Sequence, residues 1–194
     1  MKKLLICLLP VLACAACGLI PHSAPGLTQH DVGNDFEAPA TRKPLPLRSV
    51  TVSASQVVSG LSMYYRYNAQ PTERGVYAYN RWAAPPANLV EEALARLLPI
   101  ESEGKCRLEL QISDVILEIN RKGFGKVLLA GQGAISVDGK NPVFKRVMDV
   151  RVPLSRVEPA AEAEGLRDAI VLLADRTDGW ISGNAEIAGY CRQQ

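Results

Sequence analysis

The first eighteen residues constrain this chain more than any other segment. Lys2 and Lys3 give a positively charged start, and Leu4–Ala13 follow as an apolar run that only Pro10 interrupts before small residues end the segment. This order of charge, apolar run and small residues is typical of a secretory signal. A transmembrane helix needs about 20 apolar residues, so this run is too short to be one. The sequence therefore predicts a domain that folds outside the reducing cytoplasm.

A cysteine closes the predicted signal, and its surroundings resemble the lipobox of bacterial lipoproteins. Ala15 and Ala16 precede Cys17, and Gly18 follows it. The resemblance implies a lipoprotein signal peptide over residues 1–16, removed by cleavage. Cys17 then becomes the new N-terminus and carries the lipid, including palmitate-type acyl chains.

Two alternatives to this assignment stay open. Cys14 is a second candidate for lipidation, but the bulky Leu12 stands where the lipobox prefers a small residue. Export followed by cleavage after Ala16, without any lipid, is the other. Gly18 stands where an aspartate is associated with retention in the inner membrane. The resemblance therefore implies the periplasmic side of the outer membrane of a Gram-negative bacterium.

The charge of the mature chain argues against nucleic-acid binding. The full chain has 22 Lys and Arg residues and 20 Asp and Glu residues. Cleavage removes Lys2 and Lys3, which leaves a formally neutral chain. Nucleic-acid binding calls for a basic patch, so we expect no nucleic-acid partner.

Two cysteines remain beyond the lipidated position, Cys106 and Cys191. In an oxidising compartment such a pair predicts one disulfide. Two buried free thiols are the alternative. We expect no metal site, because His22 and His30 lie in the N-terminal linker and no CxxC spacing occurs.

The chain divides into a tether and a single domain. Residues 17–44 are rich in proline and polar residues and show no apolar period, which predicts a flexible tether. Residues 45–194 carry the periodic patterns of one folded domain. In its first half, alternation predicts three strands and helical spacing predicts an amphipathic helix. The strands are expected at 48–53, 63–67 and 75–79, and the helix at 86–98.

The second half of the domain repeats the order of strands and then helix. Residues 106–120 alternate as a long strand whose apolar parity shifts after Asp114, which predicts a β-bulge near Ser113 and Asp114. Two more strands are expected at 126–137 and 142–153, with a hairpin at 138–141 between them. A last helix is expected at 160–180. This order predicts an α+β fold, an antiparallel sheet with two amphipathic helices packed on one face.

Nothing in the folded part points to catalysis. It contains no histidine, so no Ser-His-Asp or Cys-His pair is available. Gly123 and Gly125 flank a phenylalanine in a turn that a strand follows, which is not a dinucleotide-binding loop. Glu91 and Glu92 fit a solvated helix face. We therefore expect neither an enzyme nor a cofactor.

Six aromatic residues gather within a short stretch of the chain. They are Tyr64, Tyr65, Tyr67, Tyr77, Tyr79 and Trp82. One interpretation is a cross-strand ladder with a core tryptophan, since such pairs stabilise hairpins. The other is a contact patch for a partner, since Tyr and Trp anchor interfaces. Burial of the side chains distinguishes the two.

The segment from Tyr77 to Pro86 resembles a motif of a known family. It reads Tyr-Ala-Tyr-Asn-Arg-Trp-Ala-Ala-Pro-Pro, which is similar to the Tyr-x(2–3)-Arg-Trp-x-x-Pro-Pro segment of the ABC-type transport auxiliary lipoproteins. These include the PqiC-like proteins of MCE-associated lipid transport. The order of signal, tether and strands also agrees over residues 17–182. The chain departs from the family pattern at residues 68–74 and in its two domain cysteines.

The resemblance implies a function without catalytic residues. It implies an outer-membrane lipoprotein that is accessory to an MCE/ABC-type lipid transport system, with an MCE-domain protein and an ABC permease as partners. Tyr77, Tyr79, Arg81 and Trp82 are the candidate partner-binding residues. Two alternatives remain: a structural or assembly lipoprotein of a secretion or cell-wall complex, and a carrier that binds phospholipid between its helices and its sheet.

Overall fold

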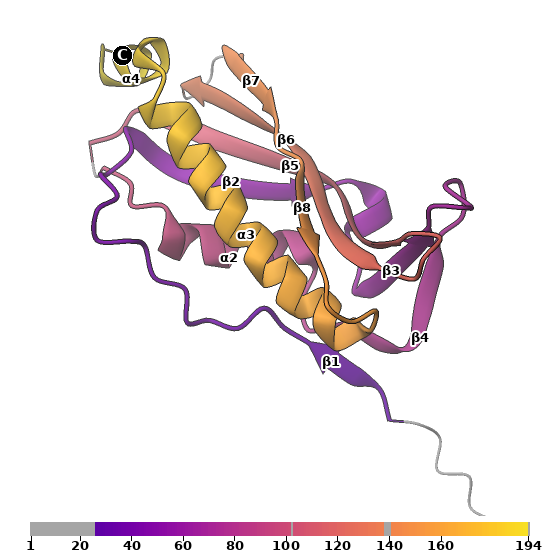
Figure 1. Cartoon of the computed structure of the whole chain (residues 1–194). Coiled ribbons are helices and arrows are strands. Elements are labelled where there is room, and N and C mark those ends of the chain that lie inside the picture. The colour runs from indigo at the N-terminus through magenta and orange to yellow at the C-terminus, as the bar shows by residue number, and fades with distance from the viewer. Residues whose placement is uncertain (1–25, 102, 138–140, 194) are drawn as a thin grey trace, which may run out of the picture.

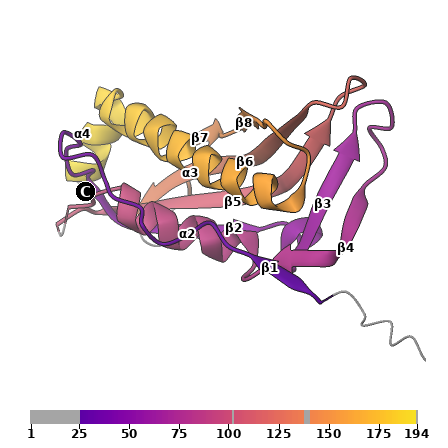
Figure 2. The same cartoon turned by 60° about the horizontal axis from the view of Figure 1, so that its bottom comes forward.

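The structure, a computed structural model, describes residues 26–101, 103–137 and 141–193. In chain order the elements are β1 (Thr28–His30), β2 (Leu47–Ala54), the 3₁₀ turn η2 (Gln56–Val58), β3 (Ser62–Tyr67), β4 (Gly75–Trp82), α2 (Pro86–Leu97), β5 (Cys106–Ile119), β6 (Gly125–Val137), β7 (Phe144–Val147), β8 (Val150–Pro153), α3 (Pro159–Ser182) and α4 (Ala185–Gln193). The strands form one sheet, and α2 and α3 lie over the same face of it (Figures 1 and 2). The α+β class predicted from the sequence is confirmed.

The sheet is mixed, which corrects the prediction of an antiparallel sheet. β5 is its centre: β6 pairs with one edge in antiparallel fashion, and β2 and β3 pair in parallel with the two halves of the other edge. Helix α2 supplies the crossover that brings the chain from the β3–β4 hairpin back into β5, and parallel neighbours need such a crossover. The alternation of each strand indicates its buried face but carries no information on the direction of its neighbour.

The predicted bulge in β5 is confirmed. The pairing of β5 with β6 shifts register between Ile112 and Asp114. Opposite this point, a Cβ on Gly131 would lie 2.6 Å from the backbone oxygen of Gln111. A glycine is therefore required where the bulged strand comes close to its partner.

Both predicted helices form, with small shifts at their ends. α2 begins at Pro86 and ends at Leu97, and it buries its apolar stripe against the sheet. α3 packs on β6 and β8, and a Cβ on its Gly165 would lie 2.5 Å from Cδ2 of Leu154. This glycine lets the helix approach the sheet closely.

One predicted strand is two strands in the structure. The segment 142–153 forms β7 and β8, which pair with different halves of β6. Between them the amide of Met148 donates to the carbonyl of Gly131 at 2.9 Å. The predicted hairpin at 138–141 lies outside the described residues except for Asn141.

Residues 28–44, which we call the N-terminal strap, are part of the fold. β1 pairs in parallel with the end of β4, and Val32 and Phe36 are 4% and 6% exposed. Figure 1 shows this segment running beside α2 and α3. The predicted flexible tether over residues 17–44 is therefore wrong for the part that the structure describes. Two isolated apolar anchors suffice to dock a strap, and they leave no period in the sequence.

Two arginines fasten the strap to α3 and α2. Arg167 donates to the carbonyl of Val32 at 2.8 Å and to the carboxylate of Asp35 at 2.7 Å. The hydrogen bond from Arg167 lowers the pKa of Asp35. Arg42 donates to the carbonyl of Leu97 and forms an ion pair with Asp175.

The predicted disulfide is present and joins the last helix to the sheet. Cys106 at the start of β5 is bonded to Cys191 on α4, with 5.2 Å between their Cα atoms. α4 itself was not predicted. It docks through the buried Ile187 and through Tyr190, whose ring meets Phe144 of β7 edge to face at 5.7 Å.

Candidate interaction surface

The clustered tyrosines of the sequence all lie on the β3–β4 hairpin. We call this hairpin the aromatic wing. The wing stands at the end of the sheet opposite α4 (Figure 2). The Tyr65 ring meets Tyr67 edge to face at 5.8 Å and Tyr77 at 5.0 Å. A Cβ on Gly75, the cross-strand partner of Tyr65, would lie 2.2 Å from its Cζ. The glycine thus leaves room for the ring that joins the two strands.

The wing combines a ladder with exposed aromatic surface. Tyr65 and Tyr77 are half-buried, whereas Tyr67 is 48% exposed and Tyr79 is 52% exposed. The ladder interpretation is confirmed for the half-buried rings, and the contact patch stays a prediction for the exposed ones. The inner rings hold the hairpin together, and the outer ones are available to a partner.

The four candidate partner-binding residues divide in the same way. Tyr79 is exposed, and Tyr77 and Arg81 are half-buried. Trp82 is 0% exposed, which corrects its assignment as a contact residue. Its amide donates to the carbonyl of Leu61 at 2.8 Å, so the residue fixes the junction of the hairpin with the core.

A buried carboxyl group lies behind the wing. Glu162, in the first turn of α3, is 0% exposed, and neither of its carboxylate oxygens has a hydrogen-bond partner among the described residues. Burial raises the pKa of Glu162 well above its ordinary value. Burial also raises the pKa of Tyr77, and the charge of Glu162 adds to this shift. No pattern in the sequence marked Glu162, because it stands between alanines in a helix whose acidic residues are otherwise mostly exposed.

We expect Glu162→Gln to stabilise the protein at neutral pH. Folding raises the pKa of Glu162. The free-energy cost of burying its ionised carboxylate is therefore absent below the unfolded pKa of about 4.3, where the group is protonated in both states. The cost grows as the pH rises toward the folded value. Removing the ionisation should add about 1–3 kcal/mol to the free energy of unfolding at about pH 7, and almost nothing at about pH 4. Urea denaturation at both pH values measures the difference.

Glu164→Gln is the matched control, since the Glu164 side chain is 69% exposed two residues further along α3. It should leave the pH dependence of stability unchanged. A Glu162→Gln variant whose stability tracked the parent at both pH values would contradict the assignment of a costly buried carboxylate.

Ion pairs stabilise the face of the wing that the helices do not cover. Arg74 donates to both carboxylate oxygens of Asp114, at 2.9 and 2.8 Å, and its guanidinium lies 6.0 Å from the ring centre of Tyr64. Burial alone would raise the pKa of Glu118, but hydrogen bonds from Arg66 and Lys126 outweigh it and lower the pKa. These contacts tie the wing to β5.

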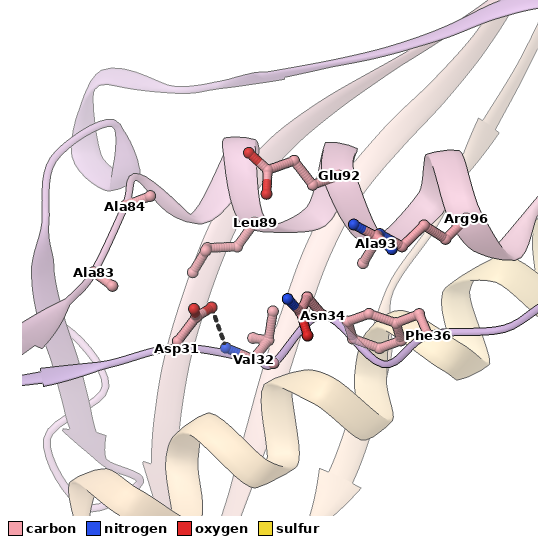
Figure 3. A pocket seen from close by; sticks show the side chains of 11 residues that line it. Asp31, Val32, Asn34, Phe36, Ala83, Ala84, Leu89, Glu92, Ala93 and Arg96 are labelled. Atoms are coloured by element: carbon pink, nitrogen blue, oxygen red, sulfur yellow. Dashed lines mark hydrogen bonds between the residues drawn. The ribbon is translucent and has the colours of Figure 1, made fainter.

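A small hollow lies under the N-terminal strap (Figure 3). It measures about 150 Å³ and is bounded by the strap, by α2 and by the loop after Trp82. Phe36, Leu89 and Ala93 give it apolar walls, and Glu92 and Arg96 stand at its polar side. The strap, which the sequence did not place here, forms one of its walls.

Of the neighbouring Glu91 and Glu92, one has a structural role. Glu91 accepts a hydrogen bond from the amide of Val52 at 2.6 Å, which caps the outer edge of β2. Glu92 is exposed. Within residues 26–101, 103–137 and 141–193, no three metal-binding side chains come together.

Two further observations bear on the membrane and on the anchor. Among the helices that the structure describes, none is both long enough and apolar enough to cross a bilayer. Cys17 and its alternative Cys14 lie outside the described residues.

Comparison with known proteins shows the fold. No family model matches the chain, and no curated protein matches it in sequence. A crystal structure of a Xanthomonas campestris protein, described under the family model DUF330, superposes with a TM-score of 0.65 at 16% identity, over 79% of this chain and 93% of that one. A second crystal structure, of an uncharacterised protein, gives a TM-score of 0.56 at 12% identity, over 76% of this chain and 99% of that one. At these identities, the chain has their fold and is otherwise distant from them.

Proposed function

We propose that this chain is a lipoprotein anchored in the outer membrane, where it serves as an accessory component of an MCE/ABC-type lipid transport system. Its signal and Cys17 support the anchor. The family that its sequence resembles corresponds to DUF330, and a DUF330 protein shares its fold. The observation that carries the proposal is the aromatic wing, whose outer tyrosines Tyr67 and Tyr79 are about half exposed on a hairpin next to the core. Exposed tyrosines are well suited to anchor a protein partner.

In this role the chain contributes position rather than chemistry. Acyl chains on Cys17 hold it to the inner leaflet of the outer membrane, and two or more chains make such an anchor durable where one is marginal. The wing then docks an MCE-domain protein. The ABC ATPase, elsewhere in the envelope, supplies the energy for transport, and this chain has no catalytic role.

The second candidate is an assembly lipoprotein of a secretion or cell-wall complex, without a transport role. The same exposed tyrosines support it too, because they indicate a protein partner without naming it, and the family resemblance is what favours the first candidate. The identity of the captured partner separates the two candidates.

Photocrosslinking in intact envelopes tests the proposal. We expect a photoreactive phenylalanine at position 79 to capture an MCE-domain protein. The same group at Leu172, which is 42% exposed on α3, is the matched control and should capture nothing specific. Capture of a secretion or cell-wall component at position 79 would favour the second candidate. Equal background at both positions would contradict a docking role for the wing.

Replacement of the lipidated cysteine tests the anchor in the same cells. Cys17→Ser should abolish signal cleavage of the lipoprotein type and change the mass of the product. Normal processing and normal membrane retention of Cys17→Ser would mean that Cys17 is not the lipidated residue. Cys14→Ser is its control and should leave the lipid in place.

A further inference from the structure

The turn between β5 and β6 is built to a fixed shape. The Asn120 side chain accepts hydrogen bonds from the amides of Lys122 and Phe124, at 2.8 and 3.1 Å. The backbone of Asn120 also bonds to Phe124 at 2.9 Å and to Gly123 at 3.0 Å. Gly123 has a φ of +82°, which favours glycine over other residues. Four hydrogen bonds therefore hold a turn of five residues.

The long side chains of this turn point out of the core. Phe124 is 66% exposed, and Arg121 and Lys122 are exposed. Neither cation forms an ion pair with a described residue. We call these three residues the basic tip. A rigid turn that presents two free cations and an aromatic ring to solvent is pre-organised for a contact outside the domain.

A hollow with a mostly neutral lining lies next to the basic tip. The turn of the aromatic wing lies beside the tip (Figure 2). The hollow, of about 470 Å³, is lined by residues of both turns, among them Tyr67, Ile119 and Arg121. The carboxylate of Glu118 is already occupied by Arg66 and Lys126. The tip therefore keeps its positive charge.

We propose that the basic tip rests on the anionic surface of the bilayer that carries the lipid anchor. This inference rests on the proposed function, because the anchor brings the domain to a membrane. Arg and Lys are attracted to anionic headgroups, and an adjacent phenylalanine ring can insert at the boundary between headgroups and acyl chains. The chain enters the domain at β1, on the side away from α4, and the tip also lies on that side in both views (Figures 1 and 2). Contact at the tip would orient the domain on the membrane.

Tryptophan quenching in proteoliposomes tests this contact with the full lipidated chain. Phe124→Trp places a reporter at the tip, while the native Trp82 and Trp180 are 0% and 8% exposed and give a steady background. Brominated phosphatidylcholine is the quencher, in vesicles with or without an equal share of phosphatidylglycerol. We expect quenching at position 124 in the anionic vesicles and much less in the neutral ones.

Two variants make the test specific. Val147→Trp is the matched control, because Val147 is 68% exposed beside Arg146 on β7, near α4. It should not be quenched. Neutralising Arg121 and Lys122 to glutamine should lower the equilibrium constant for contact by about fivefold per charge.

The outcomes separate this inference from the proposed function. Equal quenching at positions 124 and 147 would overturn the inference. Equal quenching at position 124 in vesicles with and without phosphatidylglycerol would do the same. So would capture of an envelope protein, in place of lipid, by a photoreactive group at position 124. The mass of the same preparation reports its lipidation, so a missing anchor is recognised independently of a missing contact.

Discussion

Replacing Cys106 and Cys191 by serine should lower the free energy of unfolding by about 4–5 kcal/mol. The disulfide closes a loop with a sequence separation of 85 residues, and the loss of entropy in the unfolded chain grows with the length of the closed loop. α4 has nine residues, too few for a stable isolated helix. Its amides should therefore lose protection from hydrogen exchange first. Chemical denaturation and hydrogen exchange of the double variant measure both effects.

The reduced parent protein is the natural control for this variant. Its stability should fall to that of the double serine variant, since both lack the same covalent link. Equal stability of the variant and the oxidised parent, with two free thiols in the latter, would show that the cysteines are not bonded in the native protein.

Trp82→Ala should cost about 3–5 kcal/mol of stability, the range for truncating a buried aromatic side chain. Trp82 is 0% exposed at the point where β1, β3 and β4 meet, so its removal leaves a cavity under three strands. Trp82→Phe should cost less, because it keeps part of the buried volume. Urea denaturation with the disulfide intact measures both.

Tyr79→Ala is the matched control on the same strand. Since Tyr79 is 52% exposed, we expect its replacement to change stability by no more than about 0.5 kcal/mol. Crosslinking from position 79 should persist in the Trp82→Phe background. A Trp82→Ala variant as stable as Tyr79→Ala would mean that the tryptophan lies at the surface, where it could contact a partner.

Local patterns predicted the elements that bury one continuous face. The helices near residues 86–98 and 160–180, and the shift of parity at Asp114, all follow from the spacing of apolar residues. The shift identified a bulge because one inserted residue reverses which face of a strand is apolar. The break between β7 and β8 has apolar residues before and after it. The alternation therefore continues across it and predicts a single strand.

The residues of the candidate site could be predicted from the sequence only in part, for a related reason. The cluster of tyrosines pointed to the aromatic wing, but a tryptophan favours a core and an interface alike. The sequence therefore left Trp82 as either a core residue or a candidate contact residue, and its burial decides for the core. Glu162 carried no signal, because the sequence of one helix does not tell which of its acidic residues the rest of the fold will cover.

Spacing along the chain and counting were enough to predict the class of the fold, the central bulge and the cysteine pair that forms the disulfide. The direction of β2 and β3 relative to β5, the docking of the N-terminal strap and the burial of Trp82 and Glu162 became visible only in the folded molecule. Periodicity indicates which side of an element is buried. Which element buries it depends on contacts between distant segments, and these leave no local pattern in the chain.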